Sequence, residues 1–569
     1  MGRYRAWMAL AAAVFVVATV PFARSVRPEL TNLDDYAYVG LHPEIQGGLT
    51  AANVWWAFGT TADFIYMPLT RLGYQLDWTL AKKGSEPQVM YAHSVALHGV
   101  NAVLLFLLFA MLSGSPAAAF FAALVWAVHP LRVESVAWIS SRKDLVSMVG
   151  LLLALIAWVR FRRAGTAGGA MRWYAVSLLA FVLGLLGKPS VMTFPFLAAT
   201  LDAFFLRRRD MSDLRSLWSW DYAAPLLMFV AVAVFTKACQ DAGVASLPDV
   251  GDVPFPYRVF NAAVSYGVYL VHTALPLGLA PQCAMRYPGL PRLWYAALPV
   301  AAATLWFAWR SFRRGGMFAA AIVWYTFAIG PMLGIAAFGH HAFADRFTYI
   351  PSVGLSFLLL AVGGSAAAVG VRVAGVAVLA ALAFRQVGFW RDDRTLFEHL
   401  LAVDGERNYT AWFNLAFHHW EITHDLPRSI ECFRRGREVT PSYALTDGRG
   451  VVQLMALVEA GDVDGAVALL HDITVFEHEF YGSNRHTDGL IAARGMYFLL
   501  IGNIAQARDD LERLEKDPKA KNGLHVRYLR AKILGKEKGP EAEREELRRL
   551  VAARPDCCDY LRYRFLEKR

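Results

Sequence analysis

Long apolar stretches recur along the first two thirds of the chain, separated by short polar segments. The first runs over residues 6–22, and the others lie near 90–112, 116–130, 144–159, 173–187, 190–206, 222–238, 258–278, 293–309, 317–336, 349–367 and 371–388. Several approach the ~20 residues that a helix needs to cross ~30 Å of hydrocarbon. This pattern predicts an all-α fold that begins with a polytopic transmembrane helical bundle.

Basic clusters between these stretches predict the orientation of the bundle, because cytoplasmic loops carry an excess of Lys and Arg. Counting crossings forward from the N-terminus and backward from Arg313 places both ends of 258–278 outside the cytoplasm. We therefore expect that segment to be re-entrant or interfacial, which leaves about eleven true spans. Everything after Trp390 is then expected outside. The clusters are Arg3/Arg5, Arg160/Arg162/Arg163/Arg172, Arg207/Arg208/Arg209 and Arg310/Arg313/Arg314.

After Trp390 the sequence changes to charged, helix-forming residues with a degenerate internal repeat. Its small anchor residues are spaced 37, 41 and 35 positions apart, at Ser429, Ala466, Ala507 and Ala542. Tetratricopeptide repeats have a period of about 34 residues, and stacked copies form concave surfaces that bind peptides or other domains. We therefore predict a membrane domain over 1–388 and a tetratricopeptide-like α-solenoid over 389–569. A purely structural cap on the membrane domain is the alternative for the repeats.

Composition and charge narrow the class of protein. Of the 569 residues, 56% are hydrophobic and 18% are charged, against about 45–50% and about 25% in soluble domains. This excludes a disordered chain, a collagen and an ordinary soluble enzyme. The net charge of +10 fits basic cytoplasmic loops, and no nucleic-acid partner is expected. Five scattered cysteines without a Cys/His zinc spacing predict no structural metal.

The first outer loop, residues 24–88, contains an acidic pair just after the first apolar stretch. Asp34 or Asp35 is a candidate general base, which must lie within hydrogen-bond reach of the proton that it takes. The alternative is a helix N-cap, a position that favours Asp.

The second outer loop concentrates charge between two apolar stretches, and Lys188 adds a cation at a later outer turn. Ionisable residues at membrane depth are expensive and indicate function by default. Ordinary loop charges, and a lysine that extends to the membrane surface, are the alternatives. The candidates are His129, Arg132, Glu134, Arg142, Lys143, Asp144 and Lys188.

The late outer loop places Arg346 beside Asp345 just before an apolar stretch. The planar guanidinium of arginine matches two phosphate oxygens at once, so Arg346 is a candidate to bind a lipid phosphate. His340 and His341 precede it, but adjacent histidines rarely converge on one ion, and no metal site is predicted.

Three of these stretches together resemble the transmembrane and tetratricopeptide-repeat-containing O-mannosyltransferases, which belong to the polytopic GT-C class of glycosyltransferases. They are Asp34-Asp35, then His129-Pro-x-x-x-Glu134 with Arg142-Lys-Asp144, and Arg346-x-x-Tyr349-x-Pro351-Ser352. The repeats behind them extend the resemblance over nearly the whole chain. The chain departs from the family at Pro189, where relatives often have an acidic residue after the lysine.

The resemblance implies that a sugar, mannose above all, moves from a polyprenyl-phosphate carrier to a hydroxyl of protein Ser or Thr, with inversion. Asp34 or Asp35 is then the base, and Arg346 with Arg142 and Lys143 stabilises the leaving phosphate. Glu134 orients the acceptor or a basic side chain, and His129 shapes its loop. Arg132, Asp144, Lys188 and Tyr349 complete the expected substrate site.

We expect a bacterial plasma membrane. The orientation given by the basic clusters puts the repeats on the periplasmic side, where we expect them to hold a protein or peptide acceptor. The residues indicate no cofactor, and the sequence leaves open whether a divalent cation is needed. Two other functions are compatible with the sequence. One is a GT-C enzyme that glycosylates a lipid or a cell-envelope polysaccharide, and the other is a non-enzymatic scaffold that uses its repeats.

Overall fold

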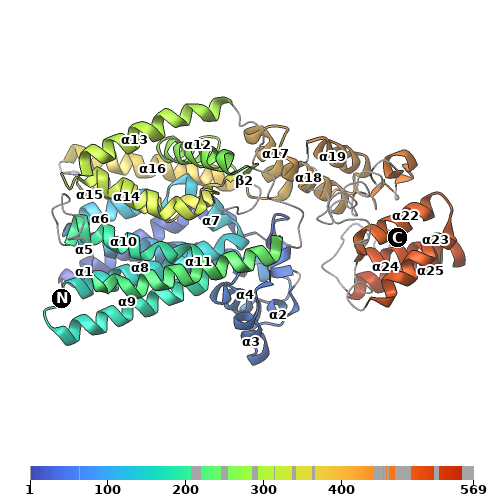
Figure 1. Cartoon of the computed structure of the whole chain (residues 1–569), viewed down its shortest axis with the longest axis horizontal. Coiled ribbons are helices and arrows are strands. Elements are labelled where there is room, and N and C mark those ends of the chain that lie inside the picture. Colours follow the sequence, from blue (N-terminus) through green and yellow to red (C-terminus); the bar gives the residue numbers. More distant parts are fainter. Residues whose placement is uncertain are drawn as a thin grey trace. The chain divides into compact units, whose positions relative to one another are not determined.

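The computed structural model describes most of the chain (Figure 1). It covers residues 2–206 apart from positions 28, 41, 63 and 64, then 219–244, 254–284, 292–312, 314–335, 341–361, 366–439, 488–517 and 524–553, with scattered positions between 453 and 469. The predicted Arg207/Arg208/Arg209 cluster, Arg313 and His340 lie outside these residues. The all-α prediction is confirmed: helices dominate, and the described strands are the short antiparallel pair β1 (Cys283–Ala284) and β2 (His341–Phe343).

The chain divides into two compact units. The first comprises Met1–Gly243 and Gly251–His399, and the second comprises Val244–Val250 and Leu400–Arg569. The second boundary falls inside helix α17 (Asp393–Asp404). The predicted division at residues 388 and 389 stays a prediction.

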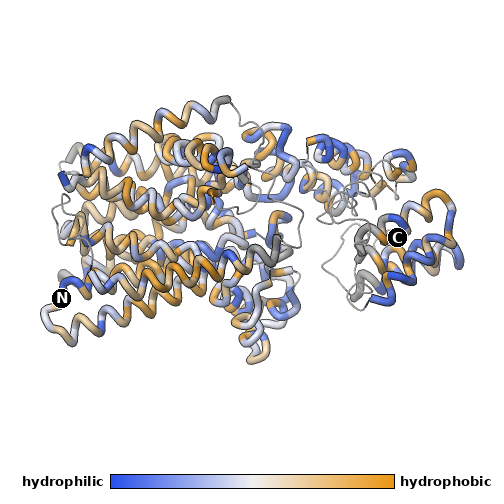
Figure 2. Tube along the Cα trace, in the orientation of Figure 1, coloured by the Kyte–Doolittle hydropathy of each residue, from blue (hydrophilic) through white to orange (hydrophobic). Residues whose placement is uncertain are grey.

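The first unit is a bundle of apolar helices, and Figure 2 shows hydrophobic residues along most of their length. Its main helices are α1 (Gly2–Thr19), α5 (Glu86–Ser113), α6 (Pro116–Ala127), α8 (Arg142–Arg162), α9 (Ala167–Gly187), α10 (Phe194–Leu201), α11 (Ala223–Val244), α12 (Phe255–Ala274), α13 (Ala297–Phe312), α14 (Met317–Ile329), α15 (Ser352–Leu360) and α16 (Ala366–Gly388).

Seven helical segments among the described residues are long and apolar enough to cross a membrane, or eight if one bent pair is a single span. The prediction of about eleven spans is therefore not confirmed. Three expected spans correspond to α13, α14 and α15, which have 16, 13 and 9 residues. The bent pair joins α6 to residues 130–137 at 60°, because Pro130 cannot continue a helix. The segment predicted to be re-entrant or interfacial forms the unbroken helix α12.

The first outer loop folds into short helices at one end of the bundle, the end that also holds α7 (Val133–Ala137) in Figure 1. They are the π-helical turn η2 (Tyr36–Gly40), α2 (Pro43–Gln46), α3 (Ala51–Gly59) and α4 (Pro68–Leu80). Trp55 is largely exposed, and tryptophan is enriched where a membrane meets water.

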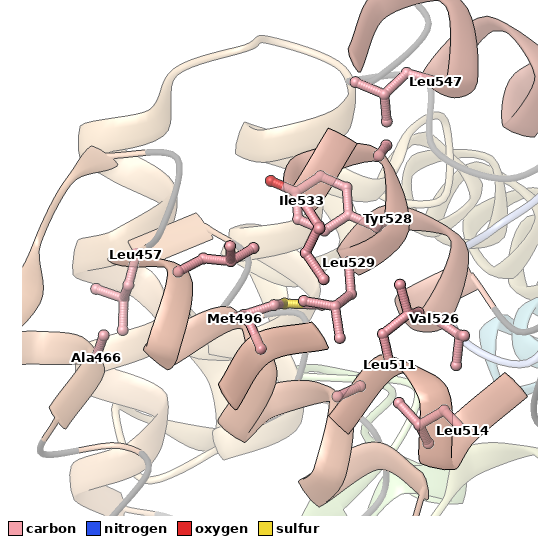
Figure 3. Close-up of a cluster of buried hydrophobic side chains, with 14 of the residues drawn as sticks. Leu457, Ala466, Met496, Leu511, Leu514, Val526, Tyr528, Leu529, Ile533 and Leu547 are labelled. Atoms are coloured by element: carbon pink, nitrogen blue, oxygen red, sulfur yellow. The ribbon is translucent and has the colours of Figure 1, made fainter. Parts of the chain in front are cut away.

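Helices of the second unit contact one another in consecutive pairs, and the tetratricopeptide-like repeat stays a prediction. The pairs are α18 (Tyr409–Glu421) with α19 (Leu426–Val439), α22 (Asp488–Leu500) with α23 (Ile504–Lys516), and α24 (Leu524–Lys538) with α25 (Pro540–Ala553). Of the predicted anchors, Ser429, Ala466 and Ala507 are fully buried and Ala542 is half-buried. Figure 3 shows Met496 of α22, Leu511 of α23 and Leu529 of α24 in one apolar cluster.

Helices α8 and α9 approach closely because two glycines face each other. A Cβ on Gly150 would lie 2.4 Å from the backbone nitrogen of Gly184 and 2.9 Å from the carbonyl oxygen of Ala180. Membrane helices pack through such small residues because lipid supplies no hydrophobic force between them. This contact fixes the position of α8, whose first turn carries three predicted site residues.

Gly150→Ala is expected to destabilise the full-length protein, because backbone atoms of α9 cannot yield to the added methyl group. Overpacking of this kind costs about 1–3 kcal/mol. Thermal unfolding in detergent measures the loss. Gly168→Ala in α9 is the matched control, since its Cβ would meet nothing within 4 Å. Equal melting temperatures for the two variants would contradict the close packing.

Candidate functional site

The second outer loop forms three short helical turns that are buried at one end of the bundle. These are η4 (Pro130–Arg132), α7 and η5 (Ile139–Ser141), followed directly by α8. Arg132, Glu134, Arg142, Lys143 and Asp144 are all buried. Buried charges are tolerated when they are paired and hydrogen-bonded, so the partners of these side chains define the site.

Glu134 and Arg346 form a buried ion pair between α7 and the turn η13 (Asp345–Thr348). One carboxylate oxygen of Glu134 accepts from the Arg346 guanidinium, and the other accepts from the Arg346 backbone N–H at 2.7 Å. The guanidinium also donates to the Pro281 carbonyl at 3.2 Å and lies over the Trp138 ring. Burial alone lowers the pKa of Arg346, but Glu134 raises it above its usual value, so Arg346 is charged.

Lys188 lies beside Arg346 in a small polar cavity. The Lys188 ammonium donates to Asp144 Oδ1 at 2.6 Å, and burial lowers the pKa of the lysine. Asp144 Oδ2 and Ser190 Oγ are buried without a hydrogen-bond partner among the described residues. All four side chains line a cavity of about 10 Å³, together with Phe347 and Tyr349. Unsatisfied buried polar atoms around a cavity indicate a place for a polar ligand or water.

The two predicted acidic residues have different environments. Asp35 is fully buried and accepts from Thr31 N at 3.1 Å, Ser140 N at 2.8 Å and Ser140 Oγ at 2.5 Å. Burial raises its pKa, and these donors lower it in part. Asp34 is exposed, and its charge raises the pKa of Arg346. Asp34 is thus the carboxylate of the pair that is open to solvent and electrostatically coupled to the cavity.

The structure places Arg142 apart from the cavity. Its guanidinium pairs with Asp77 of α4 and donates to Ser94 Oγ at 3.1 Å, while Asp77 also contacts His93. Asp77 is a site residue that the sequence did not predict, because nothing in the pattern of the first outer loop marks it as the partner of a cation 65 positions away. Lys143 packs over the Tyr38 ring at 4.2 Å, and its charge contributes to the lowered pKa of Lys188.

Arg132, His129 and Tyr349 hold the loops around the cavity. Arg132 donates to the carbonyl oxygens of Thr348 at 3.1 Å and of Tyr349 at 2.9 Å. His129 accepts from Leu131 N at 3.2 Å and contacts the Thr273 carbonyl at 3.0 Å. The Tyr349 hydroxyl contacts His98 Nδ1 at 2.8 Å. Arg132 therefore joins η4 to η13 through backbone acceptors, while His129 contacts α12 and Tyr349 contacts α5.

Ser190 and Trp138 are further site residues that the sequence did not single out. Ser190 follows the predicted Lys188 at the start of η6 (Pro189–Thr193), and Trp138 lies inside the charged loop. Both sit next to predicted residues, but a neutral side chain carries no charge signal. The residues that the structure describes contain no group of three or more His, Cys, Asp or Glu side chains that could hold a metal ion.

Helix content and apolar length together define a multi-pass, all-α membrane protein with a buried, cation-containing site. The chain is 32% identical over 156 residues to Protein O-mannosyl-transferase TMTC1 of Mus musculus, a match that covers 26% of this chain and 16% of the relative. It is 26% identical over 221 residues to Protein O-mannosyl-transferase TMTC4 of Homo sapiens (35% and 30%). It is 26% identical over 178 residues to Protein O-mannosyl-transferase Tmtc2 of Drosophila melanogaster (30% and 19%).

The chain is thus similar to several curated TMTC proteins, at 25–32% identity over about a quarter to a third of its length. The matches span less than a third of the length of these curated relatives. No protein-family model matches the chain, and no solved structure does.

Asp35→Ala is expected to lower the free energy of unfolding by about 1–3 kcal/mol, because it leaves buried donors without an acceptor. The matched control Asp34→Ala removes an exposed carboxylate and is expected to change stability by less than about 0.5 kcal/mol. Thermal unfolding of both full-length variants in detergent compares them. A larger loss in Asp34→Ala would contradict the structural role given to Asp35.

Proposed function

We propose that the chain is a membrane glycosyltransferase that moves mannose from a polyprenyl-phosphate carrier to a Ser or Thr hydroxyl of a protein. The observation that carries the proposal is the shared cavity of Lys188 and Arg346, two cations from distant parts of the sequence beside unpartnered polar atoms. A phosphate needs such fixed cations, and burial makes their attraction stronger than in water. The names of the relatives support the sugar and the protein acceptor.

In the proposed reaction, Asp34 takes the proton of the acceptor hydroxyl. The hydroxyl oxygen then forms a bond to the anomeric carbon on the face opposite the carrier. The bond from that carbon to the phosphate oxygen breaks, and the lipid phosphate leaves with the electron pair, so the product is inverted. Negative charge grows on the phosphate in the transition state, where Arg346 and Lys188 stabilise it.

The other predicted residues act around this reaction. Glu134 orients Arg346, and Asp144 orients Lys188, through the ion pairs described above. Lys143 adds positive charge near Lys188. Arg142 stabilises the outer loop through Asp77 rather than contacting the phosphate. No step needs a metal, and whether a divalent cation assists is decided by the assay below.

A second cavity supports a lipid-linked donor. It measures about 530 Å³ and is lined mainly by apolar residues of η6, α10, α11 and α14, among them Met192, Phe196, Ala233 and Phe327. The two cavities are lined by residues that are close in the sequence. Ser190 and Ala328 line the polar cavity, and Met192 and Phe327 line the apolar one. We expect part of the isoprenoid chain to occupy the apolar cavity and its phosphate to lie near the two cations.

The proposed site faces the outer side of a bacterial plasma membrane. Helix α8 begins near the site, where its first turn carries Asp144, and ends in Arg160 and Arg162. A basic end is expected in the cytoplasm, so the site is expected at the opposite surface. The repeats would then hold the acceptor outside the cytoplasm, and their paired helices are a suitable scaffold for a peptide.

Asp34→Asn is expected to abolish sugar transfer, because an amide cannot accept the proton. General-base catalysis is worth about 10²–10⁴ in rate. The assay uses the purified full chain, labelled polyprenyl-phosphate mannose and a Ser/Thr peptide, with and without chelator. Glu44→Gln, a carboxylate change in the same outer segment, is the control and should keep full activity. Turnover by Asp34→Asn would disprove the assignment of the base, and a wild type that consumes no carrier sugar with any acceptor would disprove the function.

Ala233→Trp is expected to raise the KM for a long-chain donor about tenfold. The indole would fill the apolar cavity, and the donor would lose about 1.4 kcal/mol of binding free energy from apolar contacts. The KM for a short-chain donor should stay unchanged. Val234→Trp is the control, since Val234 is 66% exposed on the same helix. Equal KM increases for both donors would show that the cavity does not hold the lipid tail.

A further inference from the structure

The segment that carries Asp34 has little regular structure of its own before residue 35. Residues 29–34 form bends and turns, and the helical turn η2 begins only at Tyr36. The position of Asp34 therefore depends on what holds the residues before it. A misplacement of ~1 Å can cost about 10²-fold in rate.

Arg27 is a buried cation that joins this segment to two other elements. Its Nε donates to the Tyr91 hydroxyl of α5 at 2.9 Å, and its guanidinium donates to Thr31 Oγ1 and to the carbonyl oxygen of Trp390. The Tyr91 hydroxyl in turn donates to the Glu29 carbonyl at 3.2 Å. Arg27 thus ties the start of the segment to the residues that follow α16.

Asp393 makes the second connection between the same two parts of the chain. It is the first residue of α17, and both of its carboxylate oxygens lie 3.1 Å from the backbone nitrogen of Asn32, which donates to them. Asn32 is two positions before Asp34. Burial raises the pKa of Asp393 to about 7, so its neutral form is populated near neutral pH.

The same junction also reaches the phosphate side of the site. The Trp390 ring lies 6.2 Å from the Trp138 ring, and the Arg346 guanidinium lies over Trp138 at 5.0 Å. Residues 390–393 therefore contact the segment of the proposed base through hydrogen bonds, and the surroundings of Arg346 through aromatic rings.

We propose that Arg27 and Asp393 are positioning residues that tie the α16–α17 junction to residues 27–35 and so hold Asp34 at the site. The catalytic part of this inference rests on the proposed function. The hydrogen bond from Asn32 needs an oxygen acceptor at position 393 but no charge. An amide therefore preserves the connection, and a methyl group removes it.

The test compares Asp393→Ala, Asp393→Asn and the control Glu398→Gln in the full chain in detergent. Glu398 lies on the same helix in an exposed ion pair with Arg394. Hydrogen–deuterium exchange of peptides that cover 29–35 is expected to accelerate in Asp393→Ala and to match the wild type in the other two. Unchanged exchange in Asp393→Ala would overturn the proposal. This readout is independent of any enzymatic activity.

Kinetics test the consequence for catalysis. Asp393→Ala is expected to lose about 10- to 100-fold in kcat, with the KM for the donor unchanged because Lys188 and Arg346 stand on other elements. Asp393→Asn is expected to recover kcat to within about twofold. Faster exchange with an unchanged kcat would overturn the positioning role. If the wild type transfers no sugar, the proposed function fails, and the exchange result alone decides whether Asp393 holds the segment.

Discussion

The buried ion pair of Glu134 with Arg346 is the interaction on which the rest of the site depends. Removing two charges from water is expensive, and breaking such a pair costs about 3–5 kcal/mol because one charge is left alone. Glu134 accepts from both the backbone and the guanidinium of Arg346, so it fixes the turn η13 as well as the side chain. Arg346 is therefore held beside Lys188 at the polar cavity.

The buried cations near the site are restrained by three kinds of contact: carboxylate ion pairs, backbone carbonyls and an aromatic ring. Lys188 has Asp144, Arg142 has Asp77, Arg132 has backbone carbonyls, and Lys143 has an aromatic face. An apolar bundle tolerates this much charge only because each group is paired or stacked. The same restraints organise the cavity in advance, and a site organised in advance stabilises developing charge without reorganising during the reaction.

Neighbouring residues of one motif can have separate roles, because their side chains leave the backbone in different directions and reach different surroundings. Asp34 and Asp35 are equivalent in the sequence, yet Asp35 is buried and accepts from the Ser140 backbone, whereas Asp34 is exposed. Arg142 and Asp144 are two positions apart on the first turn of α8, and they pair with α4 and with Lys188. A helix rotates successive side chains by about 100°, so adjacency along the chain does not bring them to one site.

The sequence by itself determined the all-α class and the apolar bundle, and it suggested most residues of the candidate site. The length of an apolar stretch, and a charge next to one, are local properties of the sequence. The sequence did not determine how many helices reach full span length, since α13, α14 and α15 end early. Only the tertiary structure decided which carboxylate meets which cation. Ion pairs such as Glu134 with Arg346 join residues 212 positions apart, and no local pattern specifies a contact between distant segments.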